Sequence, residues 1–252
     1  MIKILHIIRQ ASVGGAFRSL IATAKYLSLF SDYKQRIVSL LSAESAAIKI
    51  AKETGMNVLA SLNREAILQE IVNADIVHLH FWNTPEMYEF LRSGLPPMRL
   101  LIKFNVAGCY PPQIITKELI DYADFALTTS PYAHESPIFQ QLPEKIRLEK
   151  TGMIYGATDF ARIANISPQP HDTFNIGYIG TVGFVKMHPN YVPMSAEINI
   201  PNVKFIVCGK GDAYPKLKRQ AEALQVKERF EFQGYVEDIR SVIELMDIFC
   251  YP

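Results

Sequence analysis

Short apolar runs alternate along the chain with stretches whose apolar residues recur at helical spacing. The first run, residues 2–8, is rich in β-branched residues and predicts a buried strand, followed by a small-residue turn at 11–15 and a helix at 16–30. The same pattern predicts further strands at 35–41, 56–59, 76–81, 100–106, 125–129 and 146–151, and helices at 45–54, 64–73, 85–92, 117–123 and 132–140. Strands that alternate with helices in this way predict a mainly parallel sheet covered on both faces.

A proline-rich polar stretch then interrupts the pattern. Residues 167–173 read S-P-Q-P-H-D-T, which is typical of a linker. Beyond it, strands are expected at 175–180, 203–208, 230–233 and 248–251, with helices at 190–197, 214–224 and 239–246. We therefore expect an α/β protein with two domains, residues 1–166 and 167–252. The second ends on an apolar strand without a following helix, so we expect it to be incomplete.

Composition narrows the class of protein. The chain has 252 residues, a net charge of +1 and 49% hydrophobic residues, as expected for a soluble globular protein. The near-zero charge gives no indication of a nucleic-acid partner. No apolar run approaches the ~20 residues of a membrane span, and no signal peptide is recognisable. The three cysteines, Cys109, Cys208 and Cys250, lack metal-ligand spacing, so we expect reduced thiols in a cytoplasmic protein. Peripheral contact with the inner face of a membrane remains open.

Two adjacent glycines, Gly14 and Gly15, lie between the first strand and the first helix. Glycine lets the backbone approach a ligand closely, and the start of a helix offers free N–H groups to an anion. One interpretation is therefore contact with a phosphate or a sugar hydroxyl. The other is a tight turn that requires glycine for steric reasons.

Polar side chains also end two later strands of the first half. His78 and His80 share one face of their strand, but no carboxylate or cysteine nearby completes a metal site, and we expect no metal there. His78 is expected to be packed, and His80 either to be packed or to line a cleft. Asn105 either forms the floor of a cleft or simply favours a turn.

The second half opens on a strand, a glycine-rich loop and a lysine. Residues 177–183 read G-Y-I-G-T-V-G and precede Lys186 and a helix start, an arrangement that offers backbone N–H groups and one ammonium charge to a diphosphate. A second turn, C-G-K-G-D at 208–212, lies at the end of the next strand. Both turns are expected at the same edge of the sheet, where they could bind the same ligand. The alternative for the second is a plain turn without a ligand.

These pieces, in this order, resemble the family-4-like glycosyltransferases. G-G-A-F-R-S-L at 14–20 resembles the family's first glycine loop and helix, and A-D-I-V-H-L-H at 74–80 resembles its aspartate-strand-histidine segment. I-G-Y-I-G-T-V at 176–182 resembles the strand that opens the donor lobe. The most specific similarity lies at 203–252, where V-K-F-I-V-C-G-K-G-D, F-E-F-Q-G-Y-V-E-D-I and M-D-I-F-C-Y-P follow one another at the family's spacing.

The resemblance implies a GT-B architecture of two Rossmann-like lobes, with the acceptor on the first and a nucleotide-diphosphate sugar on the second. It implies hexosyl transfer with retention at the anomeric carbon, without a metal or other cofactor. Lys186 matches the family's diphosphate lysine, and Tyr235 lies where the nucleobase is contacted. By the same resemblance, Asn105 and Lys186 are the expected catalytic positions, and the expected substrate-binding residues are Gly14, Gly15, His80, Gly180, Thr181, Gly209, Gly211 and Tyr235.

The chain departs from the family pattern at three places. Thr181 stands where many members have an arginine, and Asn105 where many have a histidine. The family also continues beyond a segment like 248–252 into a glycine-containing stretch and a helix that contribute acidic residues. The sequence therefore leaves three functions open: a glycosyltransferase with an unknown glycan, lipid or small-molecule acceptor, a non-catalytic sugar-nucleotide or protein-binding scaffold, and a sugar-nucleotide epimerase of similar architecture.

Overall fold

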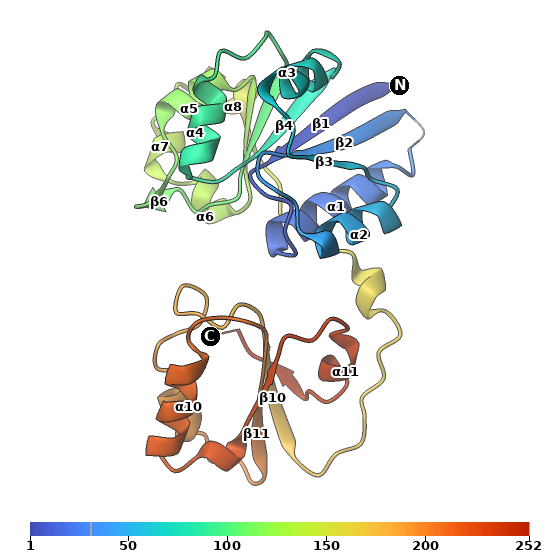
Figure 1. Cartoon of the computed structure of the whole chain (residues 1–252). Helices are drawn as coiled ribbons and strands as arrows, with labels where there is room; N and C mark the ends of the chain where they lie inside the picture. Colours follow the sequence, from blue (N-terminus) through green and yellow to red (C-terminus); the bar gives the residue numbers. More distant parts are fainter. Residues whose placement is uncertain (31, 252) are drawn as a thin grey trace. The chain divides into compact units, whose positions relative to one another are not determined.

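The computed structural model describes residues 1–30 and 32–251 and contains two compact units, Met1–Asp159 and Phe160–Pro252. Each unit is an α/β assembly built on its own parallel sheet (Figure 1). The boundary between the units precedes the proline-rich stretch at 167–173, which belongs to the second unit. Its backbone is anchored there, because the N–H of Gln169 donates to the carbonyl of Glu244 over 2.7 Å.

The first unit holds seven parallel strands in the order β3-β2-β1-β4-β5-β8-β9. Their bounds are β1 Ile2–Ile8, β2 Tyr33–Ser39, β3 Val58–Ala60, β4 Ile76–Phe81, β5 Leu100–Phe104, β8 Phe125–Thr128 and β9 Thr151–Met153. The helices are α1 Gly15–Leu27, α2 Ser45–Glu53, α3 Arg64–Val72, α4 Pro85–Arg92, α5 Lys117–Tyr122, α6 Pro131–His134, α7 Pro137–Gln140 and α8 Glu144–Lys150. A small antiparallel hairpin, β6 Cys109–Tyr110 and β7 Gln113–Ile114, was not predicted from the sequence.

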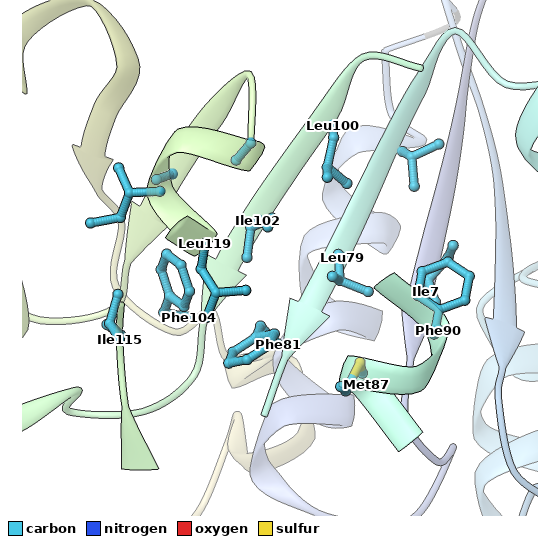
Figure 2. Packing of buried hydrophobic residues seen from close by; sticks show 14 of the residues in the cluster. Ile7, Leu79, Phe81, Met87, Phe90, Leu100, Ile102, Phe104, Ile115 and Leu119 are labelled. Atoms are coloured by element: carbon cyan, nitrogen blue, oxygen red, sulfur yellow. The ribbon is translucent and has the colours of Figure 1, made fainter. Parts of the chain in front are cut away.

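Alternation along the strands produces two apolar layers on the first sheet. Leu5 and Ile7 of β1 point into one layer with Leu79 and Phe81 of β4, where helices α3, α4, α5 and α7 add buried side chains. Figure 2 shows Met87 and Phe90 of α4 over this face. Ile8 of β1 belongs to the opposite layer, with apolar residues of α1 and α2. The buried apolar side chains of β1 therefore face one helical layer or the other.

The second unit holds four parallel strands in the order β12-β11-β10-β13. The strands are β10 Phe174–Ile179, β11 Val203–Cys208, β12 Phe230–Gly234 and β13 Ile248–Phe249, and the helices are α9 Tyr191–Ala196, α10 Tyr214–Ala223 and α11 Arg240–Ile243. Tyr178, Phe205 and Leu217 are almost fully buried at its centre. Counted in chain order, these strands repeat the order of the first four parallel strands of the first unit, which is the doubly wound arrangement.

Three sequence-based expectations need correction. The strand expected at 146–151 is mostly helix α8, because the run from Glu144 to Lys150 is rich in charged residues that a solvated helix accommodates, and β9 begins only at Thr151. The single helix expected at 132–140 is divided into α6 and α7, with Pro137 as the first residue of α7. The helix expected at 239–246 is reduced to the short α11. Among the described helices, none has the length and apolar character needed to cross a membrane.

Candidate functional site

Each sheet has one place where its winding direction reverses. In the first unit β1 lies between β2 and β4, and in the second unit β10 lies between β11 and β13. In open parallel sheets, ligands bind beyond the carboxyl ends of the strands at such a switch point, because the connections diverge there. The loops after β1, β4 and β10 are therefore the places where ligand binding is expected.

In the second unit, backbone hydrogen bonds join three consecutive strand-end turns. The N–H of Gly180, after β10, donates to the carbonyl of Cys208 over 3.0 Å, and the N–H of Val182 donates to the carbonyl of Lys210 over 2.8 Å. The N–H of Gly209, after β11, donates to the carbonyl of Gly234 at the end of β12 over 2.7 Å. The ends of β10, β11 and β12 therefore form one continuous backbone layer.

Glycine is required in this layer because the turns approach one another closely. Gly209 has a φ of +145°, and a Cβ added to it would lie 1.7 Å from the carbonyl oxygen of Gly180. A Cβ added to Gly211 would lie 2.0 Å from the carbonyl oxygen of Val182. At Gly180 the added atom would meet the hydroxyl oxygen of Tyr178 at 2.8 Å. These three glycines therefore have a steric role, whatever ligand the layer binds.

The half-buried phenol of Tyr214 contacts the same layer. Its oxygen lies 3.0 Å from the carbonyl oxygen of Gly209 and accepts a hydrogen bond of 3.2 Å from the N–H of Gly234. Burial raises the pKa of the Tyr214 hydroxyl, so the proton that it donates is retained. The layer is consequently fixed by one side chain from α10 as well as by its own backbone.

Two exposed lysines accompany the layer. The N–H of Lys186 donates to the carbonyl of Gly183 over 2.8 Å, and within the described residues its ammonium group has no hydrogen-bond or ion-pair partner. The ammonium nitrogen of Lys210 lies 4.7 Å from the ring centroid of Tyr235, a residue that is 47% exposed. Thr181 is exposed beside Val182, the residue bonded to the Lys210 carbonyl. Lys210 thus supplies a cation in the turn adjoining Thr181.

In the sequence, Lys210 is recognisable only as part of the C-G-K-G-D turn. No local pattern associates that lysine with Tyr235, because the two side chains belong to different strand-end turns. Only the pairing of β11 with β12 brings these turns together.

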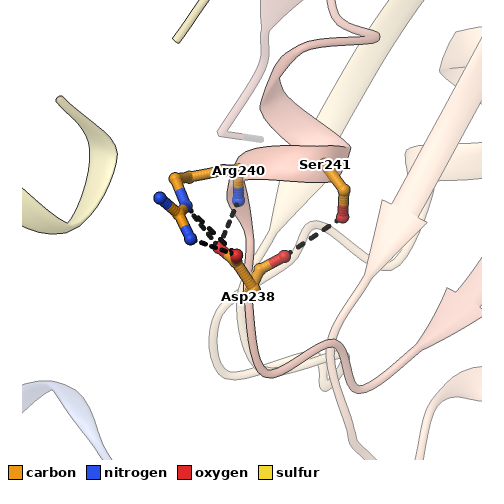
Figure 3. Close-up of polar contacts among 3 residues, drawn as sticks. All are labelled: Asp238, Arg240 and Ser241. Atoms are coloured by element: carbon orange, nitrogen blue, oxygen red, sulfur yellow. Dashed lines mark hydrogen bonds and ion pairs between the residues drawn. The ribbon is translucent and has the colours of Figure 1, made fainter. Parts of the chain in front are cut away.

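An ion pair follows Tyr235 at the start of α11 (Figure 3). The Asp238 carboxylate accepts from the guanidinium of Arg240 at 2.6 and 2.9 Å, and the hydroxyl of Ser241 donates to the Asp238 carbonyl over 3.1 Å (Figure 3). The hydrogen bonds from Arg240 lower the pKa of Asp238 to about 2. This carboxylate is therefore ionised and already paired, which makes it unsuited to accept a proton from a substrate.

In the first unit, a hollow of about 340 Å³ lies at the switch point between β1 and β4. Gly14 and Gly15 line it from the start of α1, and Trp82 and Thr84 line it from the segment after β4. A Cβ added to either glycine would meet no atom within 4 Å, and Gly14 has a φ of −125°. Steric crowding thus does not require glycine here, and no side chain caps the first turn of α1.

Arg9, which lines this hollow, belongs to a charged pair. The guanidinium of Arg9 donates to both carboxylate oxygens of Glu86, over 2.9 and 3.0 Å. The hydrogen bond from Arg9 is the main reason why the pKa of Glu86 falls to about 2. The pair keeps Arg9 oriented at the hollow, with its charge largely balanced by Glu86.

Asn105 directly follows β5, and its backbone N–H donates to the carbonyl of Phe81 over 3.3 Å. The side-chain nitrogen is shielded from solvent and has no hydrogen-bond partner within the described residues. A buried amide donor without a partner carries a free-energy cost that a hydrogen bond to a ligand would remove. An amide can hydrogen-bond a substrate there but cannot exchange a proton with it.

His80 does not line a cleft, in contrast to one of the two expectations. It is 2% exposed, and its Nε2 lies 3.2 Å from Nδ1 of His6. Strand alternation points the His80 side chain into the layer between the sheet and α1, so a ligand at the strand ends does not reach it. Of the expected residues in the first unit, Gly14 and Gly15 share a hollow and His80 lies apart from it.

A second hollow in the first unit, of about 590 Å³, adjoins the β6–β7 hairpin. The exposed rings of Tyr110 and Tyr132 line it. Asn83 fixes the hairpin to the end of β4, because its amide donates to the carbonyls of Pro112 over 2.9 Å and Ile114 over 2.7 Å. The sequence pattern did not predict this hairpin, since each of its strands has two residues and no alternation to detect.

Comparison with solved structures identifies the fold. HepE from Anabaena, in complex with UDP and glucose, superposes with a TM-score of 0.76 at 16% identity, over 100% of this chain and 74% of that protein. A glycosyltransferase from Rickettsia africae superposes with a TM-score of 0.71 at 18% identity, over 98% of this chain and 72% of that one. A putative UDP-N-acetylglucosamine 2-epimerase from Listeria monocytogenes superposes with a TM-score of 0.58 at 12% identity, over 98% of this chain and 73% of that one. The fold therefore does not by itself distinguish transferases from epimerases.

Comparison of the sequence with family models gives a match over the second unit. Residues 159–252 match the family described as glycosyl transferases group 1. No curated protein sequence matches the chain. The matched segment contains all three turns of the hydrogen-bonded layer, together with both exposed lysines and Tyr235. Residues 159–252 are thus similar to the group 1 glycosyltransferases, and the chain as a whole has the GT-B fold of two α/β units with parallel sheets.

Proposed function

We propose that the chain binds a nucleotide-diphosphate sugar through its second unit and transfers a hexosyl group from it to an acceptor. The observation that carries this proposal is the layer formed by the turns after β10, β11 and β12, which holds the exposed Thr181 and the exposed ammonium groups of Lys186 and Lys210 at the ends of adjoining strands. It lies in the segment that matches the glycosyltransferase family. HepE, which has the same fold, binds UDP-glucose.

The proposed chemistry requires stabilisation of a leaving diphosphate. As the bond between the anomeric carbon and the diphosphate oxygen breaks, the electron pair stays on that oxygen and negative charge increases there. The hydroxyl oxygen of the acceptor bonds to the anomeric carbon, and its proton passes to the departing diphosphate. Fixed ammonium groups and oriented backbone N–H groups stabilise such a charge without reorganising. We assign this role to Lys186 and to the turn containing Gly180 and Thr181, with Lys210 supplying the second cation. A metal ion has no part in this scheme, and the stereochemical outcome proposed is retention.

The nucleobase is assigned to Tyr235. Its ring is half-exposed at the end of the same layer and offers a face on which a base can stack. Gly209 and Gly211 are assigned to the backbone that supports the donor, because they allow the turns to approach one another.

We assign the acceptor, which can be a glycan, a lipid or a small molecule, to the first unit. The hollow at Gly14 and Gly15 offers the uncapped start of α1 to an anionic or hydroxyl group. Asn105 offers an amide donor that lacks a protein partner. The proposed setting is the cytoplasm, where nucleotide sugars are available, with peripheral contact at the inner face of a membrane if the acceptor is a lipid.

Calorimetric titration of the purified chain with UDP, GDP and ADP tests the donor assignment. We expect one nucleoside diphosphate to bind, and Lys186→Ala to weaken that binding roughly 10- to 100-fold, because a charge-assisted hydrogen bond is lost. The matched control is Lys227→Ala, which removes an exposed lysine that pairs with Glu222 in the same unit. Equal affinities for wild type and Lys186→Ala would remove Lys186 from the site.

A non-catalytic scaffold is the second candidate, and the amide at Asn105 favours it, since asparagine cannot act as an acid or a base. The two candidates differ in turnover. A transferase releases nucleoside diphosphate from the bound donor when an acceptor is supplied, and slowly to water without one. Tight donor binding with no release of diphosphate across a panel of glycan and lipid acceptors would favour the scaffold.

A further inference from the structure

Three histidines converge on the α1-facing side of the first sheet. His6 belongs to β1 and pairs in register with His78 of β4, and strand alternation places His80 on the same face. One ring nitrogen from each of the three lies within 4.8 Å of the other two. The cluster is remote in sequence from the turns of the second unit and has no role in the function proposed above.

A chain of hydrogen bonds fixes which nitrogens of the cluster carry protons. The amide nitrogen of Gln35 donates to the carbonyl of Ala24 over 2.9 Å, so its oxygen is the atom facing His6. That oxygen lies 3.1 Å from Nε2 of His6, which must therefore be the donor. Nδ1 of His6 then has a free lone pair, directed at Nε2 of His80 over 3.2 Å.

Two further ring nitrogens are buried without a partner. They are Nε2 of His78 and Nδ1 of His80, and neither has a hydrogen bond within the described residues. Burial also lowers the pKa values of all three histidines, which keeps the imidazoles neutral, the form that binds metal ions. A buried polar atom without a partner in a native protein calls for a ligand or a water.

No metal was expected at His78 and His80 from the sequence because no third ligand lies near them in the chain, but the pairing of β1 with β4 supplies His6 as that ligand. We propose that His6, His78 and His80 bind a divalent ion of the class that prefers imidazole ligands, such as Zn²⁺. Zinc binds histidine nitrogen at about 2.0–2.1 Å, which places tetrahedral ligand atoms roughly 3.4 Å apart. Modest rotations of the rings bring the three nitrogens from their present separation to that spacing. The ion replaces the contact between His6 and His80, and the proton on His80 moves to its other ring nitrogen.

The contact between His6 and Gln35 supports this assignment. Histidines that bind metal ions generally donate their second N–H to a carbonyl or carboxylate oxygen, which fixes the orientation of the ring. Gln35 provides such an oxygen, and its own orientation is fixed by Ala24 of α1. The ion would join β1 to β4 at the centre of the sheet, so its expected role is to stabilise the first unit.

Lys103 opposes the binding of a cation and provides a specific test. It pairs in register with His80 and is 4% exposed, so its side chain lies on the same face of the sheet. Burial lowers the pKa of Lys103, but its ammonium form repels a divalent ion. Lys103→Met removes that charge and retains an apolar chain of similar length, so we expect it to tighten metal binding at least 10-fold.

Cobalt titration of the full chain, purified in EDTA and then freed of the chelator, tests the proposal. We expect one equivalent of Co²⁺, with the three imidazoles and one water as ligands, to produce the visible absorption of a four-coordinate ion, and Zn²⁺ to displace it and raise the thermal midpoint. His78→Gln and His80→Gln should each abolish both effects, whereas His134→Gln, which changes a histidine of α6 outside the cluster, should leave them unchanged.

Circular dichroism of each apo variant shows whether it folds. If a cluster variant fails to fold, Gln35→Leu serves in its place, with affinity expected to fall about 10- to 100-fold because the His6 ring loses its orienting partner. Absence of Co²⁺ absorption together with an unchanged midpoint in wild type would overturn the proposal. Wild-type affinity in His78→Gln and His80→Gln would do so as well.

Discussion

The α-carbon of Gly209 lies so close to Gly180 that an added Cβ would be 1.7 Å from the carbonyl oxygen of Gly180. The N–H of Gly209 also donates to the carbonyl of Gly234, which fixes the backbone in this position. The φ of +145° at Gly209 adds a second restriction, because other residues rarely adopt it. We therefore expect Gly209→Ala to destabilise the second unit by about 2–4 kcal/mol, as measured by urea unfolding.

Gly14→Ala is the matched comparison in the first unit. A Cβ at Gly14 meets nothing within 4 Å, and the backbone there has a negative φ. We expect its unfolding free energy to stay within about 0.5 kcal/mol of wild type. If the proposed role of this turn in ligand contact is correct, Gly14→Ala lowers the transfer rate without loss of fold. A large loss of stability would instead assign a structural role to Gly14.

Tyr235→Ala is expected to weaken nucleoside diphosphate binding by about 1–3 kcal/mol, or roughly 5- to 150-fold, through loss of a stacking surface. The same change removes the contact with Lys210, which contributes only about 0.5–1 kcal/mol at an exposed site. Calorimetry measures the affinity, and Tyr122→Ala, a similarly exposed tyrosine on α5, is the control. An unchanged affinity in Tyr235→Ala would place the base elsewhere.

Asp238 leads to a prediction about pH. Its pKa in the folded chain is about 2, below its ordinary value of 3.8, so the unfolded state binds the proton more readily. The contribution of the ion pair to stability is therefore fully present above pH 3.8 and is lost as the pH falls toward 2. NMR titration of the Asp238 carboxyl should give the low pKa, and Arg240→Gln should return it toward the ordinary value. The same pKa in both proteins would contradict the assigned cause.

Asn83→Ala is expected to loosen the β6–β7 hairpin. The change removes the hydrogen bonds that the Asn83 amide donates to the carbonyls of Pro112 and Ile114, at about 1 kcal/mol each. Hydrogen exchange at the amide of Ile115, which bonds to the carbonyl of Gly108, reports the effect. We expect faster exchange at Ile115 and unchanged exchange in α1. The control Asn57→Ala, which alters an exposed asparagine, should leave exchange at Ile115 and in α1 unchanged. Unchanged protection at Ile115 would show that the hairpin holds without Asn83.

The sequence predicted most strands of both units because buried parallel strands are short apolar runs that stand out from amphipathic helices. Strand β4 and helix α4 have the predicted bounds, and β1 does as well. The prediction was wrong at residues 146–151, because so short a run does not by itself distinguish a strand from one face of a charged helix. The hairpin was missed because its pairing depends on the loops around it and not on a local pattern.

The sequence by itself determined the α/β class, the repeated strand-turn-helix order and the similarity of residues 203–252 to glycosyltransferases, because these properties depend on residues close together in the chain. Only the tertiary structure decided which residues lie together. Pairing of β11 with β12 brought Lys210 to Tyr235, and pairing of β1 with β4 brought His6 to the other two histidines. Those contacts join residues far apart in sequence, and strand order, which no local pattern specifies, is what creates them.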